Sequence, residues 1–459
     1  MFTIDELIQA TGGQLVQGPE GGRAKSVCID SRVIKKGQVF VAIKGDVFDG
    51  HDFVEDVVAR GIRILVLHKP VLIRNSQISV ILVKDTVRAL GHLAHFHRLR
   101  FNIPVIALTG STGKTTTKEM IAAVLNKKYR VLKNAGTQNN HIGVPLTLLK
   151  LKPSHQAAIL ECGTNQPGDI PWLADVIRPT VEVFTNIGES HLEKLRTTEG
   201  VLKEKWSLIS FIKTKGSIMI NADDPLLSTK AQGFRRARVI TYGIKRRCRY
   251  RANNVRMGKG HQLCFTVEGQ NIEIHTCGRH HVYNALAAFA CGRLLSVPAK
   301  DMAVALKHFE FPPGRGQIVK LGSGWLINDS YNANPVSMRC AVQTLQALPT
   351  KGKRIMVSAD MLELGSKAKE LHRSIGKMVA RSGIDVLITV GALSRHMAAQ
   401  ARHYSKHIQT IACSDIESAQ KQMARVFHNG DTVLVKGSRR MATERIVDFL
   451  LMPPDASLP

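Results

Sequence analysis

An apolar run, a glycine turn and a helix follow one another near the first quarter of the chain. Residues 104–108 (PVIAL) are typical of a buried strand, and the turn TGSTGKTT follows at 109–116. We expect a helix from about 115 to 127. Strand, glycine turn and helix in this order indicate a parallel sheet with crossover connections. The N–H groups of such a turn converge with the helix N-terminus on an anion, which favours phosphate binding.

The residue types in this turn suit the phosphates of a nucleotide. Lys114 is expected to reach the β- and γ-phosphates, and Thr115 to place its hydroxyl on Mg²⁺. The full motif has a glycine where Leu108 stands, so this is a shortened version. A glycine turn that binds nothing is the alternative, which the flanking strand and helix disfavour. The expected nucleotide contacts are Gly110, Ser111, Thr112, Gly113, Lys114, Thr115 and Thr116.

Two further predicted strands end in polar residues. Residues 157–160 are apolar and lead into Glu161, and residues 181–184 precede a segment that contains His191. In open α/β sheets, ligands bind at the carboxyl ends of the strands. Mg²⁺ prefers oxygen ligands and shares them with substrate phosphates. Taken alone, Glu161 is as well explained by solvent exposure, but its position indicates a metal ligand.

The chain is long enough for two or three domains of about 100–200 residues each. The predicted class is α/β with three domains. They are a small mixed α/β amino-terminal domain (1–85), a central P-loop-type parallel-sheet ATPase domain (86–313) and a carboxy-terminal Rossmann-like doubly wound domain (314–459). The sequence FPPG at 311–314 is the expected hinge. We expect the tail 453–459 to be disordered.

The charge is strongly positive: 64 Lys and Arg against 36 Asp and Glu give +28. Such a protein attracts polyanions. Nucleic acid, an anionic small substrate and a generally basic proteome are three possible reasons. The basic residues are spread along the chain, and aromatic residues make up only 5% of it. Nucleic acid is therefore the least favoured partner.

Cysteine spacing and hydropathy indicate the cellular compartment in which the protein works. The eight cysteines are scattered without a CxxC pair, which indicates neither a zinc site nor a disulfide framework. No window approaches the ~18 apolar residues of a membrane span. The start of the chain lacks the pattern of a signal peptide. We expect a cytoplasmic protein without a transmembrane segment.

Over essentially its whole length the chain resembles the Mur ligase family, whose members build the peptide stem of the bacterial cell-wall precursor. After the phosphate loop, Glu161 and His191 come GRHHVYNA (278–285), PGRG (313–316) and DSYNANP (329–335), in the order of that family. Several stretches resemble the branch that adds D-alanyl-D-alanine to UDP-N-acetylmuramoyl-tripeptide. These are NHIGVPLTLL (140–149), DSYNANP, DMLELG (360–365) with His372, and GDTVLVKGSR (430–439).

The resemblance implies two Mg²⁺ ions. The phosphate loop and Glu161 would hold the first, and His191 the second. In the family, a lysine about fourteen residues further on carries a carbamate derived from CO₂. Lys205 fits that position, with Lys203 as the rival. An ammonium would repel Mg²⁺, whereas a carbamate is an anionic oxygen ligand.

The resemblance also assigns the substrates. Asn284 would bind adenine, Arg315 the γ-phosphate of ATP, and Asp329 the ribose or its surroundings. The residues implied for UDP are Ser31, Arg32 and Asp52, those for the muramoyl-peptide are Asn139 and Asn140, and those for the incoming dipeptide are Lys436, Ser438 and Arg439. Among all these residues, Lys114, His191, Lys205 and Arg315 are the expected catalytic groups.

Three positions depart from the family pattern. His281 stands where the family has Asn, Thr137 stands where a Gly-Asn pair leads into the double asparagine, and Ala359 replaces a glycine. The second departure affects one expected contact with the muramoyl-peptide.

The implied reaction is amide formation driven by ATP. The terminal carboxylate of the tripeptide attacks the γ-phosphorus to give an acyl phosphate, which the amine of D-alanyl-D-alanine then attacks, with release of ADP and phosphate. Two alternatives remain: another ligase of the superfamily, such as folylpolyglutamate synthase or the enzyme adding the third residue, and a P-loop NTPase that binds nucleic acid. The sequence leaves open whether the third peptide residue is diaminopimelate or lysine.

Overall fold

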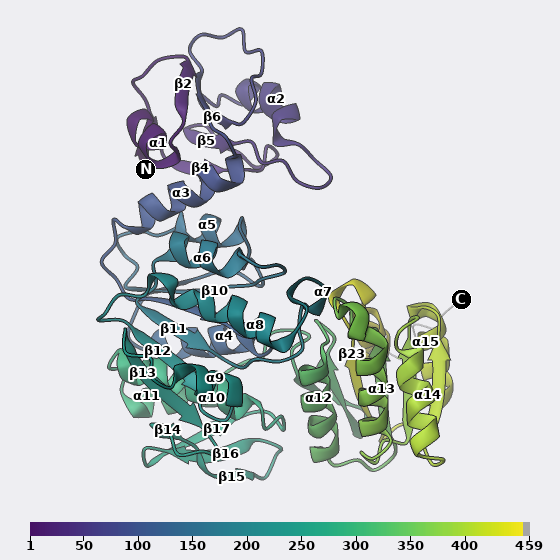
Figure 1. The fold of residues 1–459 in the computed structure, drawn as a ribbon. Helices are drawn as coiled ribbons and strands as arrows, with labels where there is room; N and C mark the ends of the chain where they lie inside the picture. The colour runs from purple at the N-terminus through teal and green to yellow at the C-terminus, as the bar shows by residue number, and fades with distance from the viewer. Residues whose placement is uncertain (453–459) are drawn as a thin grey trace.

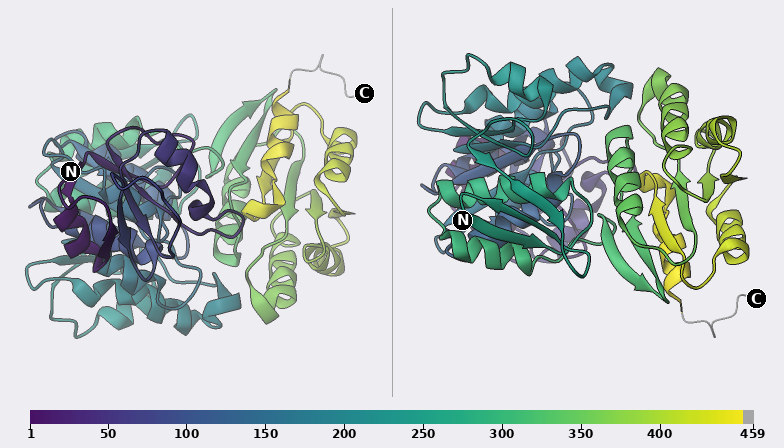
Figure 2. Two further views of the ribbon diagram at one scale, coloured as in Figure 1. Left: turned by 90° about the horizontal axis from the view of Figure 1, so that it is seen from above. Right: turned by 90° about the horizontal axis from the view of Figure 1, so that it is seen from below.

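A computed structural model describes residues 1–452, and the tail expected to be disordered lies outside them. The chain forms three α/β domains, as predicted (Figure 1). Seen from above and below, the carboxy-terminal domain lies beside the central domain, and the amino-terminal domain overlies the central one (Figure 2). Within residues 1–452, no helix combines the length and the apolar character needed to cross a membrane.

The amino-terminal domain is built on a five-stranded sheet. Its strand order is β2 (Gln14–Gln17), β7 (Ser79–Leu82), β6 (Ile64–Leu67), β5 (Gln38–Val41) and β4 (Ser26–Cys28). Only β2 runs antiparallel to its neighbour, so the sheet is mixed. A short pair, β1 (Phe2–Thr3) and β3 (Arg23–Ala24), lies beside it with the helices α1 (Ile4–Thr11), η1 (Gly50–Phe53) and α2 (Val54–Ala59).

The central domain contains a parallel seven-stranded sheet. Its order is β14 (Tyr250–Arg251), β13 (Arg238–Gly243), β12 (Ser217–Asn221), β11 (Val181–Phe184), β8 (Val105–Thr109), β10 (Ala157–Glu161) and β9 (Val131–Lys133). Strand β8 lies between β10 and β11, so the strand ends at Thr109, Glu161 and Phe184 are neighbours at one edge. The predicted parallel sheet is confirmed, and Glu161 and the segment containing His191 follow the carboxyl ends of its strands.

Helices cover both faces of this sheet. One core includes residues of α3 (Thr86–Arg98), α5 (Gly143–Leu148), α6 (Asp169–Ile177) and η2 (Ser207–Phe211), and the other those of α4 (Lys114–Leu125), α10 (His281–Leu294) and α11 (Ala299–Lys307). The remaining helices of the domain are α7 (Leu192–Leu195), α8 (Thr198–Trp206) and α9 (Pro225–Ala231).

A second, antiparallel sheet in the central region is absent from the sequence prediction. It consists of β15 (Asn253–Met257), β16 (Leu263–Val267) and β17 (Gln270–Ile274), and it packs against α11. In β16 only alternate residues are buried, so its period-two pattern lacks the continuous apolar run that marks the parallel strands.

The carboxy-terminal domain has six strands in the order β18 (Gln317–Leu321), β19 (Gly324–Asp329), β23 (Thr432–Lys436), β20 (Arg354–Ala359), β21 (Val386–Val390) and β22 (Gln409–Cys413). Only the edge strand β18 is antiparallel to its neighbour. The helices are α12 (Pro335–Ala347), η3 (Gly365–Lys367), α13 (Ala368–Val379), α14 (Arg395–Tyr404), α15 (Ile416–Val426), η4 (Arg439–Met441) and α16 (Glu444–Leu451). The doubly wound prediction is confirmed.

Candidate active site

The phosphate loop joins β8 to α4 at the centre of the main sheet. Gly113 has a φ of 78°, in the left-handed region that favours glycine, and a Cβ there would lie 2.8 Å from Oδ1 of Asn284. The helix begins at Lys114, whose Nζ donates a 2.9 Å hydrogen bond to the carbonyl of Gly110. Burial lowers the pKa of this lysine, and nearby Arg315 lowers it further. Glu161 opposes this effect, and an anion bound at the loop would likewise stabilise the charged form of Lys114.

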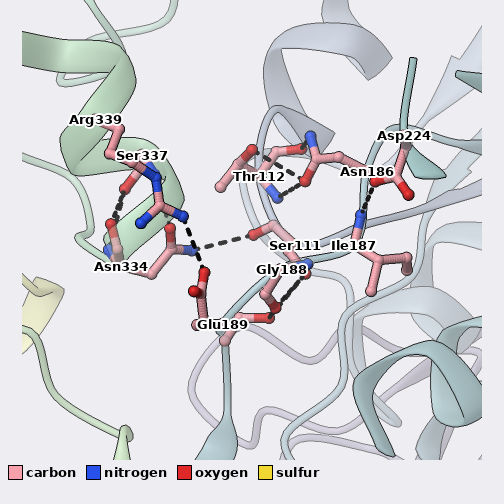
Figure 3. A network of polar contacts seen from close by, with 11 residues as sticks. Ser111, Thr112, Asn186, Ile187, Gly188, Glu189, Asp224, Asn334, Ser337 and Arg339 are labelled. Carbon is pink, nitrogen blue, oxygen red and sulfur yellow. Dashed lines mark hydrogen bonds and ion pairs between the residues drawn. The ribbon is translucent and has the colours of Figure 1, made fainter. Parts of the chain in front are cut away.

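A second loop, 185–190, holds the phosphate loop in shape (Figure 3). Oδ1 of Asn186 accepts hydrogen bonds from the backbone N–H and the hydroxyl of Thr112, at 3.0 and 3.1 Å. The hydroxyl of Ser111 donates to the carbonyl of Gly188 at 3.0 Å. These bonds restrain the loop, and a loop that is held in shape loses less conformational entropy when it binds a ligand.

The carboxy-terminal domain contacts the same loop. Nδ2 of Asn334, the residue before α12, donates to the carbonyl of Ser111 at 3.3 Å. One turn into the helix, Arg339 forms a 3.0 Å ion pair with Glu189 (Figure 3). The phosphate loop therefore lies at the junction of two domains.

Glu161, at the end of β10, is almost fully buried and its carboxylate is shared between two donors. The hydroxyl of Thr115 donates to Oε2 at 2.7 Å, and Nδ2 of Asn139 donates to Oε1 at 2.7 Å. The described residues contain no group of three or more His, Cys, Asp or Glu arranged around one metal ion. A hydroxyl and one carboxylate are the ligand set that suits Mg²⁺ held jointly with nucleotide phosphates.

His191 follows the third strand edge and has a φ of 53°, an unusual value for a residue with a side chain. Its Nδ1 pairs with Oε2 of Glu363, from the carboxy-terminal domain, at 2.8 Å. Burial lowers the pKa of the histidine, although Glu363 opposes this effect. The ring is oriented with Nδ1 toward Glu363, which leaves Nε2 to bind another group.

The two candidate lysines on α8 differ completely in environment. Lys205 is fully buried, and its Nζ has no hydrogen-bond partner among the described residues. Burial and the charge of Lys114 hold its pKa well below the usual value. Lys203 is exposed. An unpaired buried amine is costly, so only Lys205 calls for a modification or an additional partner.

A cavity of about 570 Å³ lies between the central and carboxy-terminal domains. It is lined by most of the residues singled out from the sequence: Ser111, Thr112, Gly113, Lys114, Thr115, Thr116, Asn139, Asn140, Glu161, His191, Asn284, Arg315, Asp329 and Lys436. A smaller cavity of about 100 Å³ adjoins it and is lined by residues that the larger cavity lacks, among them Ser438 and Arg439. The residues common to both cavities are Ser111, Lys114, His191, Asn332, Ala333, Asn334 and Glu363.

Asp329, which is partly buried, and Lys436, which is fully buried, form an ion pair at the carboxy-terminal side of the larger cavity. Nζ of Lys436 lies 2.6 Å from Oδ2 of Asp329 and also donates to the carbonyl of Asn332 at 2.8 Å. Burial raises the pKa of Asp329, while Lys436 acts in the opposite direction. Lys436 was expected to bind the dipeptide, but in this structure its ammonium is held by Asp329.

The expected UDP residues are not brought to the cavity. Ser31, Arg32 and Asp52 lie in the amino-terminal domain, and none of them lines it. The guanidinium of Arg32 pairs with Asp30 at 2.8 Å.

Several cavity residues were not singled out from the sequence. The ring of Tyr331 lies 3.8 Å below the guanidinium of Arg315, and its hydroxyl donates to Oγ1 of Thr137 at 2.8 Å. Glu363 lies in the DMLELG segment, for which the sequence indicates no role. Such residues are found only through contacts between domains, which local sequence patterns do not encode.

The three departures from the family pattern have distinct surroundings. Nδ1 of His281 lies 3.1 Å from the amide of Asn284, so this position supports the proposed adenine-binding residue. Thr137 accepts the bond from Tyr331. Ala359 is buried, and its Cβ occupies space beside Gly437.

Three family models match the chain in order. The model of the Mur ligase family catalytic domain matches residues 23–98, the Mur ligase middle domain 108–292, and the Mur ligase glutamate ligase domain 314–439. The chain belongs to the Mur ligase family.

Individual Mur ligases resemble the chain over nearly its full length. The UDP-N-acetylmuramoyl-tripeptide–D-alanyl-D-alanine ligase of Bacillus subtilis is 36% identical, with 93% of each chain covered. A crystal structure of MurF from Acinetobacter baumannii has a TM-score of 0.89 at 29% identity, covering 98% of this chain and 99% of that one. MurF ligase from Thermotoga maritima in complex with ADP has a TM-score of 0.82 at 27% identity, covering 93% and 97%.

Proposed function

We propose that this Mur ligase joins D-alanyl-D-alanine to UDP-N-acetylmuramoyl-tripeptide at the expense of ATP, in peptidoglycan precursor synthesis. The similarity to ligases named for this reaction supports the assignment. The observation that carries it in the structure is the group of Lys114, Thr115 and Glu161, which faces a cavity shared by two domains. Such a site can bring a nucleotide and an acceptor together.

The proposed catalytic residues Lys114 and Arg315 act through their positive charge. The carboxylate of the tripeptide and the triphosphate repel each other, and the cations Lys114 and Arg315 reduce that repulsion as the γ-phosphoryl group is transferred. The ring of Tyr331 holds Arg315 in place. The amine of the dipeptide then attacks the acyl phosphate. Catalysis of this kind depends on positioning and charge rather than on a covalent enzyme intermediate.

We propose ATP and two Mg²⁺ ions as cofactors. The Thermotoga structure with ADP supports the nucleotide. Thr115 and Glu161 would hold the first ion, because a hydroxyl and a carboxylate already lie 2.7 Å apart there. His191 would bind the second through Nε2, since Nδ1 is occupied by Glu363. The ions would neutralise developing charge on the phosphates.

The carbamate at Lys205 is part of the proposal. Burial and the charge of Lys114 hold the pKa of Lys205 well below its usual value, which favours the neutral amine, the form that reacts with CO₂. The product is an anion, which the positive charge of Lys114 would stabilise instead of opposing, as it opposes the ammonium form. Lys203 is exposed and lacks this buried environment.

The substrate-binding regions follow the domain order. We propose that residues 1–85 bind the UDP group through Ser31, Arg32 and Asp52, and that the segment 86–313 binds ATP, with Asn284 at adenine. The region 314–459 would place Asp329 near the ribose and receive the dipeptide.

Side chains near the reacting groups would complete the substrate contacts. Asn140 lines the cavity together with Asn139 and is the better placed of the two for the muramoyl-peptide, because the Asn139 amide already binds Glu161. Ser438 and Arg439 line the adjoining small cavity and would contact the dipeptide.

We also propose a cytoplasmic setting without a nucleic-acid partner. All eight cysteines are free, as expected in a reducing compartment. The charge of +28 would steer the polyanionic UDP substrate toward the protein.

A two-substrate ligation assay with mass detection tests the proposal. We expect the pentapeptide product only when ATP, UDP-N-acetylmuramoyl-tripeptide and D-alanyl-D-alanine are all present, and no product from a Lys114→Ala variant. ATP hydrolysis stimulated by DNA or RNA alone would overturn the ligase assignment. Ligation of glutamate to a folate, or of diaminopimelate or lysine to the dipeptide precursor, would instead favour another member of the superfamily.

A further inference from the structure

Lys118 is a charged residue buried in the interior of α4. It lies four residues, about one helical turn, after Lys114. Its side chain is fully buried, and it does not line the cavity. Charged side chains are almost never fully buried unless they are paired, so its partners indicate its role.

The ammonium of Lys118 binds the turn that follows β9. Nζ donates to the carbonyl of Asn134 at 2.7 Å and to that of Gly136 at 2.8 Å, and it lies 3.1 Å from a carboxylate oxygen of Glu119. Two of the three ammonium donors bind carbonyls, and the carboxylate of Glu119 balances the charge. The turn is thereby attached to the helix that begins with the phosphate-binding lysine.

The same turn holds Glu161 from two sides. Oδ1 of Asn134 accepts the backbone N–H of Glu161 at 3.0 Å, and its Nδ2 donates to the Glu161 carbonyl at 3.2 Å. Five residues on, Asn139 donates to the carboxylate. Lys118 is therefore connected to Glu161 by hydrogen bonds that pass through the residues of the turn. Thr115, on the same helix as Lys118, binds the other carboxylate oxygen of Glu161.

We infer that Lys118 is a positioning residue for the proposed metal site. By fixing the turn 134–139 to α4, it sets the distance between the helix that supplies Thr115 and the strand end that supplies Glu161. Without this ammonium the turn is free to move, Asn139 no longer restrains Glu161, and the two oxygen ligands separate. The inference rests on the proposed function only in taking Thr115 and Glu161 as metal ligands.

The test measures metal binding rather than turnover. Mn²⁺ replaces Mg²⁺ as a paramagnetic probe, and its binding in the presence of ADP is titrated by electron paramagnetic resonance for the wild type, Lys118→Met and Lys133→Met. Lys133 is the matched control because it also pairs with Glu119 but is partly exposed and does not reach the turn. We expect the dissociation constant of Mn²⁺ to rise at least about tenfold in Lys118→Met, as is usual when a group supporting a metal ligand is lost, and to stay unchanged in Lys133→Met.

Thermal unfolding of all three proteins separates positioning from general stability. A lower Tm of Lys118→Met with an unchanged Mn²⁺ dissociation constant would overturn the inference, because it would show a purely structural lysine. If Lys118→Met does not fold, Lys118→Gln replaces it: its amide can still donate to one carbonyl, and a smaller rise in the dissociation constant is expected. Wild-type protein that binds Mn²⁺ and ADP but forms no pentapeptide would contradict the proposed function and leave this inference intact.

Discussion

The hydroxyl of Thr115 donates a 2.7 Å hydrogen bond to the carboxylate of Glu161, and so connects the first turn of α4 to the end of β10. The two residues are 46 positions apart in the chain. They meet because β8 and β10 are parallel neighbours whose carboxyl ends share one edge. Thr115 and Glu161 would hold nucleotide-bound Mg²⁺ together, because a hydroxyl oxygen and a carboxylate oxygen can both bind the ion.

Glu161→Gln tests this pair directly. The amide keeps the shape of the side chain but removes the negative charge that attracts Mg²⁺. We expect ligation to fall at least about 100-fold, as for loss of a group that stabilises transition-state charge, and the Mg²⁺ concentration for half-maximal rate to rise. Initial rates across a Mg²⁺ titration measure both. Glu193→Gln, the same change at an exposed glutamate, should behave like the wild type; an equal loss there would point to a general charge effect.

Lys205→Met should abolish ligation while Lys203→Met retains it. The first change removes the only α8 lysine whose amine is buried without a partner in the described part of the chain. The wild type should also lose activity in buffers freed of CO₂ and recover it when bicarbonate is added, because carbamate formation is reversible. Rates measured before and after the addition provide the check. Full activity of the wild type without CO₂ would exclude the carbamate.

The contrast between these two lysines shows where sequence reasoning stops. Spacing alone left Lys203 and Lys205 as rivals, because it carries no information on which side of α8 faces the core. The phosphate loop and the strand end at Glu161 were predictable, since apolar runs and a glycine turn determine them locally. The bonds of Glu363 and Tyr331 were not, because they cross between domains and depend on how the domains pack.

Tyr331→Phe tests one such bond. It removes the hydroxyl that donates to Thr137 but keeps the ring below Arg315. A typical hydrogen bond contributes about 0.5–1.5 kcal/mol, so we expect the KM for UDP-N-acetylmuramoyl-tripeptide to rise about 2- to 12-fold while the KM for ATP changes little. Thr137→Val should have the same effect, and the double variant should be no worse than either single one. Additive effects in this cycle would show that the two side chains act independently.

Glu182→Gln should reduce the dependence of stability on pH. The side chain of Glu182 is fully buried in β11, neither carboxylate oxygen has a hydrogen-bond partner among the described residues, and burial raises its pKa to about 9. Its ordinary pKa is 4.5, so the folded protein holds the proton more tightly than the unfolded chain does. The stabilisation from this proton is complete below pH 4.5 and is lost as the pH rises toward 9. Glutamine stays neutral, so the difference in Tm between variant and wild type should grow in favour of the variant from pH 6 to pH 9. Parallel Tm curves over that range would mean that the carboxylate is already ionised in the folded protein at pH 6.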